Sequence, residues 1–247
     1  MVSKNQTRVI TSLQQKKFRK QHGLFFVEGK KSILEFLDAN YKPENIFVTT
    51  KNASCFPAEF CSITDENSLK KISALSTPSD CLAVFKIPKT TAFEAHGLTV
   101  VLDSINDPGN LGTIIRLCDW FGITNIVCSE DTVDVYNPKV IQSTMGSFTR
   151  VCVHYLPLTE FLKNHHQHPI LGTFMDGQPI YETQFPENGF LVFGNEANGI
   201  SAAVEKFISQ KVSIPRFSEH QKTESLNVAM ATSIFLSEYA RKKFSGK

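Results

Sequence analysis

The 247-residue sequence lacks any apolar run approaching the roughly 20 residues that a helix needs to cross a lipid bilayer. Its first 30 residues also lack the apolar core of a secretory signal peptide. Basic and acidic residues nearly balance, at 26 and 24, and 41% of the residues are hydrophobic, as in a globular chain with a sizeable core. We therefore expect a cytoplasmic protein with no membrane partner.

Cysteine spacing excludes the common structural zinc sites. The six cysteines form no CxxC pair, and they lie in apolar segments typical of strands and helices. We expect reduced thiols rather than a disulfide framework. The cluster of His165, His166 and His168 has no Cys, Asp or Glu close by in the sequence, so we interpret it as a solvated loop. The sequence therefore predicts no metal site.

Two phosphate-binding signatures are missing as well. The turn at residues 108–112, Pro-Gly-Asn-Leu-Gly, contains only two of the three glycines of a GxGxxG motif. No Gly-Lys-Ser/Thr follows it, so it is not a P-loop either. These absences disfavour a dinucleotide-dependent enzyme on an open α/β sheet, which we keep as an alternative.

The net charge of +2 is unevenly distributed along the chain. Residues 1–31 hold eight Lys or Arg against one acid, Glu28, and carry +7, whereas residues 32–100 carry −2 and residues 101–247 carry −3. A basic segment of this kind can form a surface that tracks phosphates. A solvated helix face explains the run at residues 16–20 equally well.

The first 87 residues alternate between strand and helix patterns, which predicts a small α/β domain. A stretch rich in polar residues at 88–97 interrupts the alternation and is a candidate linker. The helix at 10–21 has Leu13 and Phe18 as inward positions. The predicted strands are 24–27, 45–49 and 81–87, and the predicted helices are 10–21, 30–39 and 65–73.

A second α/β series fills residues 98–247. Its strands alternate with helices, which predicts a mostly parallel sheet whose ligands bind beyond the carboxyl ends of the strands. Three polar loops follow strands in this way, at 103–110, 194–199 and 215–227. The predicted strands are 99–102, 125–128, 151–153, 170–174, 190–193 and 211–214, and the helices are 111–121, 137–143, 157–163, 201–207 and 225–241.

The last helix, at 225–241, carries apolar or small residues on nearly every side of its first three turns, which predicts that it is buried. Ser225 suits its N-cap position. Asn227 would then lie in the first turn, where a buried carboxamide must find backbone, loop or ligand partners. For these residues taken alone, a cap with a satisfied core amide is favoured over a functional site.

Arg116 lies in a predicted helix among apolar neighbours, so its guanidinium needs an anionic partner. A structural ion pair with Glu196 and a bound phosphate are both compatible with the sequence. The loop that contains Glu196 has a glycine at each end, Gly194 and Gly199, and glycine lets backbone approach a ligand closely.

Three segments taken together resemble the three motifs of the SpoU/TrmH RNA methyltransferases, a family of the SPOUT superfamily. They are Asn110 with Arg116, the run Gly-Asn-Glu-Ala-Asn-Gly-Ile-Ser at 194–201, and Ile214-Pro215 followed by Ser-Leu-Asn-Val-Ala at 225–229. The resemblance covers residues 98–242 or so. The segment Gly-Leu-Phe-Phe-Val-Glu-Gly at 23–29, with Phe-Arg at 18–19, is similar to the accessory domain of the family.

The resemblance implies an α/β fold with two parts. One is a C-terminal SPOUT domain with a parallel sheet and a deep trefoil knot, at 98–247, and the other is a small N-terminal α/β substrate-binding domain, at 1–87. It also implies S-adenosylmethionine bound at the knot, a homodimer that pairs through the knot region, and methylation of a ribose 2′-hydroxyl of ribosomal or transfer RNA. The basic segment would bind RNA through Lys16, Lys17, Arg19 and Lys20.

The resemblance also implies roles for single residues. The cofactor would be held mostly by backbone, at Gly194, Gly199, Ile214 and Leu226, with a weaker contribution from Thr173. The catalytic and structural polar positions of the family fall on Asn110, Arg116, Glu196, Ser225 and Asn227, and Arg116 would also contact the RNA.

The third motif departs from the family pattern. The family usually has a hydrophobic residue and a glycine soon after Ile-Pro, whereas this chain has Arg216-Phe217-Ser218 there. The step from Pro215 to Ser225 is also about three residues longer than usual. We expect the chain to bind the cofactor despite this departure. We expect the shape of the loop and the substrate preference to differ from those of the family.

For the reaction we expect Arg116 to bind the phosphate beside the target ribose and to stabilise the forming alkoxide, while phosphate or water takes the proton. An arginine keeps its own proton at ordinary pH, so it is a poor general base. Single-stranded loops or bulges are the expected targets, because their riboses are accessible. A protein of the same fold that binds RNA in ribosome assembly without turnover is the alternative function.

Overall fold

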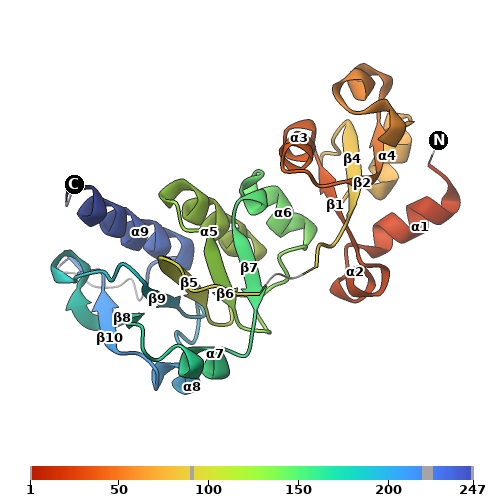
Figure 1. Ribbon diagram of the computed structural model, residues 1–247. Coiled ribbons are helices and arrows are strands. Elements are labelled where there is room, and N and C mark those ends of the chain that lie inside the picture. The colour runs from red at the N-terminus through yellow and green to blue at the C-terminus, as the bar shows by residue number, and fades with distance from the viewer. Residues whose placement is uncertain (1, 90–91, 219–224, 246–247) are drawn as a thin grey trace. The chain divides into compact units, whose positions relative to one another are not determined.

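The computed structural model describes residues 2–89, 92–218 and 225–245 (Figure 1). The chain forms two compact units, one of residues 1–90 with 134–149 and the other of residues 91–133 with 150–247. The boundaries expected from the sequence, at 87 and 98, stay a prediction. Residues 134–149, however, pack with the first unit rather than with the segments that flank them in the sequence.

The first unit is built on a four-stranded sheet with the order β1-β4-β2-β3. Strand β4 is antiparallel to β1 and to β2, and β3 is parallel to β2, so the sheet is mixed. Its elements are α1 Lys4–Ser12, α2 Lys16–His22, β1 Leu24–Glu28, α3 Lys30–Asp38, β2 Pro43–Val48, β3 Cys61–Ile63, α4 Glu66–Ile72, β4 Cys81–Lys86 and α6 Pro138–Thr144, with 3-10 turns at Thr50–Cys55, Ala58–Phe60 and Ser147–Thr149. The sequence analysis missed β3 and the 3-10 turns.

The basic helix expected at 10–21 is wrong, because two helices meet there. Helix α1 ends at Ser12 and α2 begins at Lys16, with fully buried Leu13 in the turn between them. The break leaves backbone carbonyls without helical partners. Arg19 supplies the donors: its Nη1 donates to the carbonyl oxygens of Leu13 (2.8 Å) and Gln14 (3.0 Å).

Arg19 also binds residues 134–149 to the rest of this unit. Its Nε and Nη2 both donate to Oδ2 of Asp134, and only 2% of the residue is exposed. Aromatic contacts close the same junction, with the ring of Tyr136 4.9 Å from that of Phe25 and Phe148 6.0 Å from Phe36. The expectation that Arg19 binds RNA therefore needs correction, because its guanidinium is buried and already paired.

The second unit contains a six-stranded parallel sheet with the order β10-β8-β9-β5-β6-β7, which confirms the expected α/β class. The knot implied by the resemblance stays a prediction. The elements are β5 Leu98–Leu102, α5 Pro108–Phe121, β6 Asn125–Cys128, β7 Cys152–Tyr155, α7 Leu158–Asn164, β8 Ile170–Pro179, β9 Gly189–Phe193, α8 Ala202–Glu205, β10 Gln210–Ser213 and α9 Val228–Ser245, with a 3-10 turn at Ile180–Glu182.

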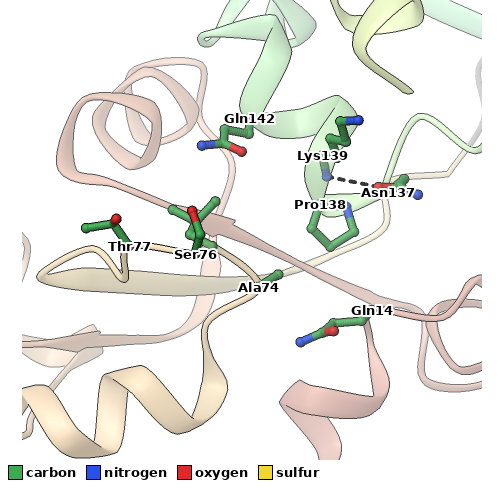
Figure 2. Close-up of a pocket in the computed structure, with 9 residues that line it drawn as sticks. Gln14, Ala74, Ser76, Thr77, Asn137, Pro138, Lys139 and Gln142 are labelled. Atoms are coloured by element: carbon green, nitrogen blue, oxygen red, sulfur yellow. Dashed lines mark hydrogen bonds between the residues drawn. The ribbon is translucent and has the colours of Figure 1, made fainter. Parts of the chain in front are cut away.

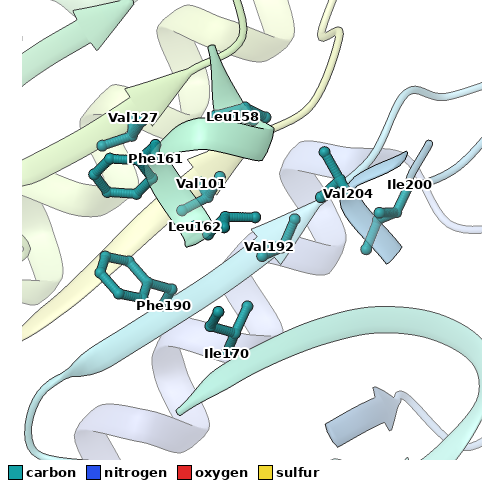
Figure 3. Close-up of a cluster of buried hydrophobic side chains, with 10 residues drawn as sticks. All are labelled: Val101, Val127, Leu158, Phe161, Leu162, Ile170, Phe190, Val192, Ile200 and Val204. Carbon is teal, nitrogen blue, oxygen red and sulfur yellow. The ribbon is translucent and has the colours of Figure 1, made fainter. Parts of the chain in front are cut away.

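Apolar side chains pack on both faces of this sheet. On one face, strand residues meet α7 and α8 in the cluster of Figure 3, which comprises Val101, Val127, Ile170, Phe190, Val192, Leu158, Phe161, Leu162, Ile200 and Val204. Helices α5 and α9 contact each other (Figure 1). Burial on both faces explains why β5 and β9 are almost entirely apolar in the sequence, with Thr99 the polar residue of β5. Within the described residues, none of the helices is long and apolar enough to span a membrane.

We predict that Asp134→Asn destabilises the first unit by about 3–5 kcal/mol, because it leaves the buried Arg19 charge without its counter-ion. The asparagine keeps the shape of the side chain. Hydrogen exchange of the β1 and α6 amides measures the effect. Glu205→Gln, which breaks the exposed Lys211–Glu205 pair of the other unit, should cost less than about 1 kcal/mol. Equal protection in both variants would contradict this role for Arg19.

Candidate active site

Three polar loops lie at the carboxyl end of the parallel sheet, as the sequence predicted. They follow β5, β9 and β10. The chain builds β6 and β7 on one side of β5 and then returns to place β9, β8 and β10 on the other side. The strand order therefore reverses between β5 and β9, and ligands of open α/β sheets bind at such a reversal.

Side-chain hydrogen bonds join the loops on the two sides of this reversal. Oδ2 of Asp103, a residue only 4% exposed, accepts from the backbone N–H of Ser201 at 2.7 Å. In return, Nδ2 of Asn195 donates to the carbonyl oxygen of Ser104 at 2.7 Å. Ser104 itself has a φ of +60°, a left-handed conformation uncommon outside glycine. These bonds hold the loop after β5 against the loop after β9.

A chain of three side chains links all three loops. Nδ2 of Asn110 donates to Oε1 of Glu196 at 2.8 Å, and Nδ2 of Asn227 donates to Oδ1 of Asn110 at 3.0 Å. Asn110 lies at the start of α5 and is half-buried, whereas Glu196 and Asn227 belong to the other two loops and are exposed. The three residues, chosen from motif matching, are thus direct neighbours in space. Their carboxylate and amide groups present an oriented row of acceptors and donors to a ligand.

Helix caps orient two of these three hydrogen-bonded residues, Asn110 and Asn227. Asp107 caps α5 by accepting from the N–H of Asn110 at 2.8 Å. Asn227 caps α9, with its Oδ1 accepting from the N–H groups of Ala229 (2.9 Å) and Met230 (3.3 Å). A cap uses the amide oxygen and leaves Nδ2 free to bond Asn110.

This geometry corrects two expectations about the C-terminal helix. Helix α9 begins at Val228 rather than at Ser225, so Ser225 is not its N-cap and lies exposed before it. The helix is not buried on all sides within the chain either, because 59% of Met230 is exposed. Residues 219–224, part of the lengthened loop noted in the sequence, lie outside the described residues.

Gly194 is required by the conformation of its own loop, because the backbone of residues 199 and 200 passes too close for a side chain. A Cβ at this position would lie 2.1 Å from the backbone carbon of Gly199 and 2.2 Å from the nitrogen of Ile200. The close approach follows from paired hydrogen bonds between Asn195 and Gly199, at 2.9 and 2.8 Å, which close the loop. Gly199 has a φ of +67°. From the sequence we expected these glycines to let the backbone approach a ligand closely. At Gly194 the close neighbour is instead the backbone of the same loop.

Two of the other residues expected to hold the cofactor, Thr173 and Ile214, lie on the β8–β10 side of the sheet. Ile214 is half-buried directly after β10, and 49% of Leu226 is exposed before α9. Thr173 is not at a strand end as expected, because β8 continues to Pro179. Its Oγ1 donates to the carbonyl oxygen of Val192 at 3.0 Å.

Arg116 is exposed on α5 and forms no hydrogen bond or ion pair with another described residue. The ion pair with Glu196 considered from the sequence is therefore absent among the described residues, where Glu196 accepts from Asn110 instead. Arg116 lies six positions after Asn110, which places the two about 120° apart around the helix and about 9 Å apart along it. Arg116 is available to an anion from outside the chain.

Neither cysteines nor histidines form a metal cluster in the described part of the chain. Burial raises the pKa of the Cys118 and Cys128 thiols, which are inert core groups. His165 is not solvated as expected. Its ring packs 4.5 Å from that of Phe161, and its Nδ1 lies 2.8 Å from the Phe161 carbonyl oxygen.

We predict that Gly194→Ala destabilises the second unit by about 3 kcal/mol, because the new methyl group overlaps backbone that cannot yield. Gly199→Ala is the matched control in the same loop. Nothing lies within 4 Å of its Cβ, so it should cost only the left-handed conformation, about 1 kcal/mol. Calorimetric unfolding of both variants measures the difference. Equal losses of unfolding free energy in the two variants would show that the close backbone approach at Gly194 does not decide the stability of the loop.

Comparisons with known proteins agree with this geometry. Residues 97–237 match the model of the SpoU rRNA methylase family, and residues 4–83 match an MRM3-like substrate binding domain. The 23S rRNA (guanosine(2553)-2′-O)-methyltransferase RlmP of Bacillus subtilis is 28% identical over 232 residues, 91% of each chain.

Solved structures show the same architecture over the whole chain. A Porphyromonas gingivalis protein assigned to the TrmH family of RNA methyltransferases is 36% identical, with a TM-score of 0.89 over 98% of this chain and 99% of its own. The SpoU methyltransferase AviRb of Streptomyces viridochromogenes, solved with AdoMet, shares the fold at 22% identity, with a TM-score of 0.87 over 99% and 100%. With the family model matching more than half of its length, the chain belongs to the SpoU rRNA methylase family.

Proposed function

We propose that this protein transfers a methyl group from S-adenosylmethionine to a ribose 2′-hydroxyl of ribosomal RNA. The observation that carries the proposal is the hydrogen-bonded row of Glu196, Asn110 and Asn227. It joins one residue from each of the three loops that the family motifs mark. The activity named for RlmP, a 2′-O-methyltransferase of 23S rRNA that this chain matches over 91% of its length, supports the same reaction.

The residues present fit S-adenosylmethionine. Leu226 and Ile214 offer aliphatic surface beside the carboxyl end of the sheet, and a mostly apolar wall with few polar groups is what adenine-sized ligands require. The closed loop at Gly194 and Gly199 lies at the same end of the sheet. We propose Gly194, Gly199, Ile214 and Leu226 as its binding residues, with Thr173 in a lesser role. When bound, the sulfonium supplies an electrophilic methyl group.

In the proposed reaction the ribose oxygen forms the new bond to carbon, the sulfur–carbon bond breaks, and the hydroxyl proton leaves to water or phosphate. Arg116 binds the phosphate beside the target ribose and stabilises the developing alkoxide. Its guanidinium is exposed and bonds none of the residues that the structure describes, which suits it to this task. The row of Glu196, Asn110 and Asn227 orients the ribose, because correct alignment carries most of the work of such a transfer. Ser225, exposed before α9, completes the proposed site.

We further propose that the first unit docks the RNA. Lys16, Lys17 and Lys20 lie exposed on α2, whereas Arg19 on the same helix turns inward. The match of residues 4–83 to an MRM3-like substrate binding domain supports this role. A cytoplasmic location is part of the same proposal.

A homodimer that pairs through the knot region completes the proposal. Helices α5 and α9 carry large exposed apolar side chains, at Trp120 (84% exposed), Met230 (59%) and Phe244 (82%). Apolar groups concentrated on two adjoining helices suit a second protein surface better than water.

We predict that labelled S-adenosylmethionine transfers its methyl group to unmodified ribosomal RNA and that the product linkage resists alkali. Arg116→Ala should lower kcat/KM at least a hundredfold, about 3 kcal/mol of transition-state stabilisation. Arg116→Lys should recover little, because an ammonium lacks the planar fork of a guanidinium. Calorimetric S-adenosylmethionine binding should stay within twofold in both variants.

The outcomes separate the alternatives. Cofactor binding without transfer to any RNA fraction would favour the binding-only protein. Near-normal turnover by Arg116→Lys would exclude the proposed role of the guanidinium. Binding of NAD rather than S-adenosylmethionine would overturn the proposed activity.

We predict that Met230→Asp converts a dimer to a monomer, because a carboxylate buried in an interface without a partner is strongly unfavourable. Sedimentation velocity measures the mass. Met175→Asp, at an equally exposed methionine on β8 (53% exposed), is the matched control and should leave the dimer intact. A monomeric wild type would refute the proposed pairing.

A further inference from the structure

The first unit contains an open cavity of about 450 Å³, lined by both polar and apolar residues, that the family motifs do not touch (Figure 2). Three segments far apart in the sequence line it. They are Gln14 in the turn between α1 and α2, residues 74–77 after α4, and residues 137–142 at the start of α6. Its size lies within the roughly 300–1,000 Å³ typical of small-molecule sites.

Internal polar contacts hold each wall of this cavity in place. Arg19 binds the carbonyl oxygen of Gln14 and, through the same guanidinium, Asp134 just before α6. Asp134 in turn accepts at its carbonyl from the N–H of Asn137 at 2.9 Å. Glu28 fixes the third wall, with its Oε1 accepting from the N–H of Ala74 at 2.8 Å. The cavity is thus formed before any ligand arrives, which lowers the entropic cost of binding.

The lining has a particular chemistry. Side-chain amides of Gln14 and Gln142 and hydroxyls of Ser76 and Thr77 face solvent at its walls. None of these four side chains bonds another group in the part of the chain that the structure describes, so their donors and acceptors are available. Lys139 is the single charged residue of the lining, which contains no carboxylate. Such a site favours a neutral polar ring with an adjacent negative charge and disfavours a cation.

We propose that this cavity binds one unpaired nucleotide of the RNA substrate, an inference that rests on the proposed function. The amides contact the edges of the base, since a carboxamide offers both donors and acceptors to it. Lys139 binds the adjoining phosphate as a point charge. The chain continues from Gln14 directly into α2 and its exposed lysines, which carry the neighbouring phosphates.

Variants of the lining test the assignment. The probe is an in vitro transcript of large-subunit ribosomal RNA, and its binding is measured by filter retention over a range of KCl concentrations. Gln14→Ala with Gln142→Ala should weaken binding roughly tenfold and leave the salt slope unchanged, because only uncharged contacts are lost. Lys139→Ala should weaken binding and lower the slope by about 0.7, the value for one phosphate contact on a single strand.

Matched controls lie on the same unit outside the cavity. Gln21→Ala removes an exposed amide from α2, and Lys42→Ala removes an exposed charge before β2. Both should stay within twofold of wild type in affinity, and Lys42→Ala should keep the slope. In the methyl-transfer assay the cavity variants should raise the KM for RNA with kcat nearly unchanged, and their S-adenosylmethionine affinity should equal that of wild type.

Two results overturn the inference. If wild type methylates RNA and the cavity variants behave like the controls, the cavity does not bind a nucleotide and the proposed function still stands. If Lys42→Ala lowers affinity and slope as much as Lys139→Ala, the contribution is general charge and not a site. A wild type that binds no RNA and transfers no methyl group would refute the proposed function, and the inference with it.

Discussion

The hydrogen bonds between the loops after β5 and β9 are the constraint on which the candidate active site depends. A parallel sheet can bring these loops close, but strands alone do not fix loop conformation. Asp103 and Asn195 do so by bonding backbone across the reversal of strand order. With the loop after β9 closed on itself at Gly194, Glu196 is held where Asn110 can reach it. The third loop then joins through Asn227, which caps α9 with one atom and bonds Asn110 with another.

The first unit relies on a comparable feature, the buried charge of Arg19, which donates four hydrogen bonds to groups of this unit. Arg19 closes the turn between α1 and α2, binds Asp134, and so attaches residues 134–149 to a sheet far from them in the sequence. A buried ion pair of this kind adds little net stability compared with apolar packing, yet breaking it is costly. Its main effect is to determine which segments pack together. Two of the segments that it joins, the turn at Gln14 and the start of α6, form walls of the cavity.

Sequence patterns predicted much of this arrangement. Alternating strands and helices indicated the parallel sheet, and β6 was predicted at its observed bounds. Motif matching selected Asn110, Glu196 and Asn227, which are hydrogen-bonded neighbours. The start of α9 was less predictable, because Ser225 and Asn227 are both residue types that suit an N-cap, and the sequence does not show which of them caps the helix. Arg19 was misassigned because a basic run looks the same whether its arginine faces water or a carboxylate 115 residues away.

The sequence by itself determined the class of fold and the residue types of the site, because periodic burial and cap chemistry are local properties of the chain. Tertiary structure alone decided which residues are neighbours. The single bond between Asn110 and Asn227 spans 117 residues, and the walls of the cavity come from three distant segments. Such contacts depend on how strands are ordered in a sheet and on which buried charge finds its partner. Neither is encoded in the spacing of residues along one segment.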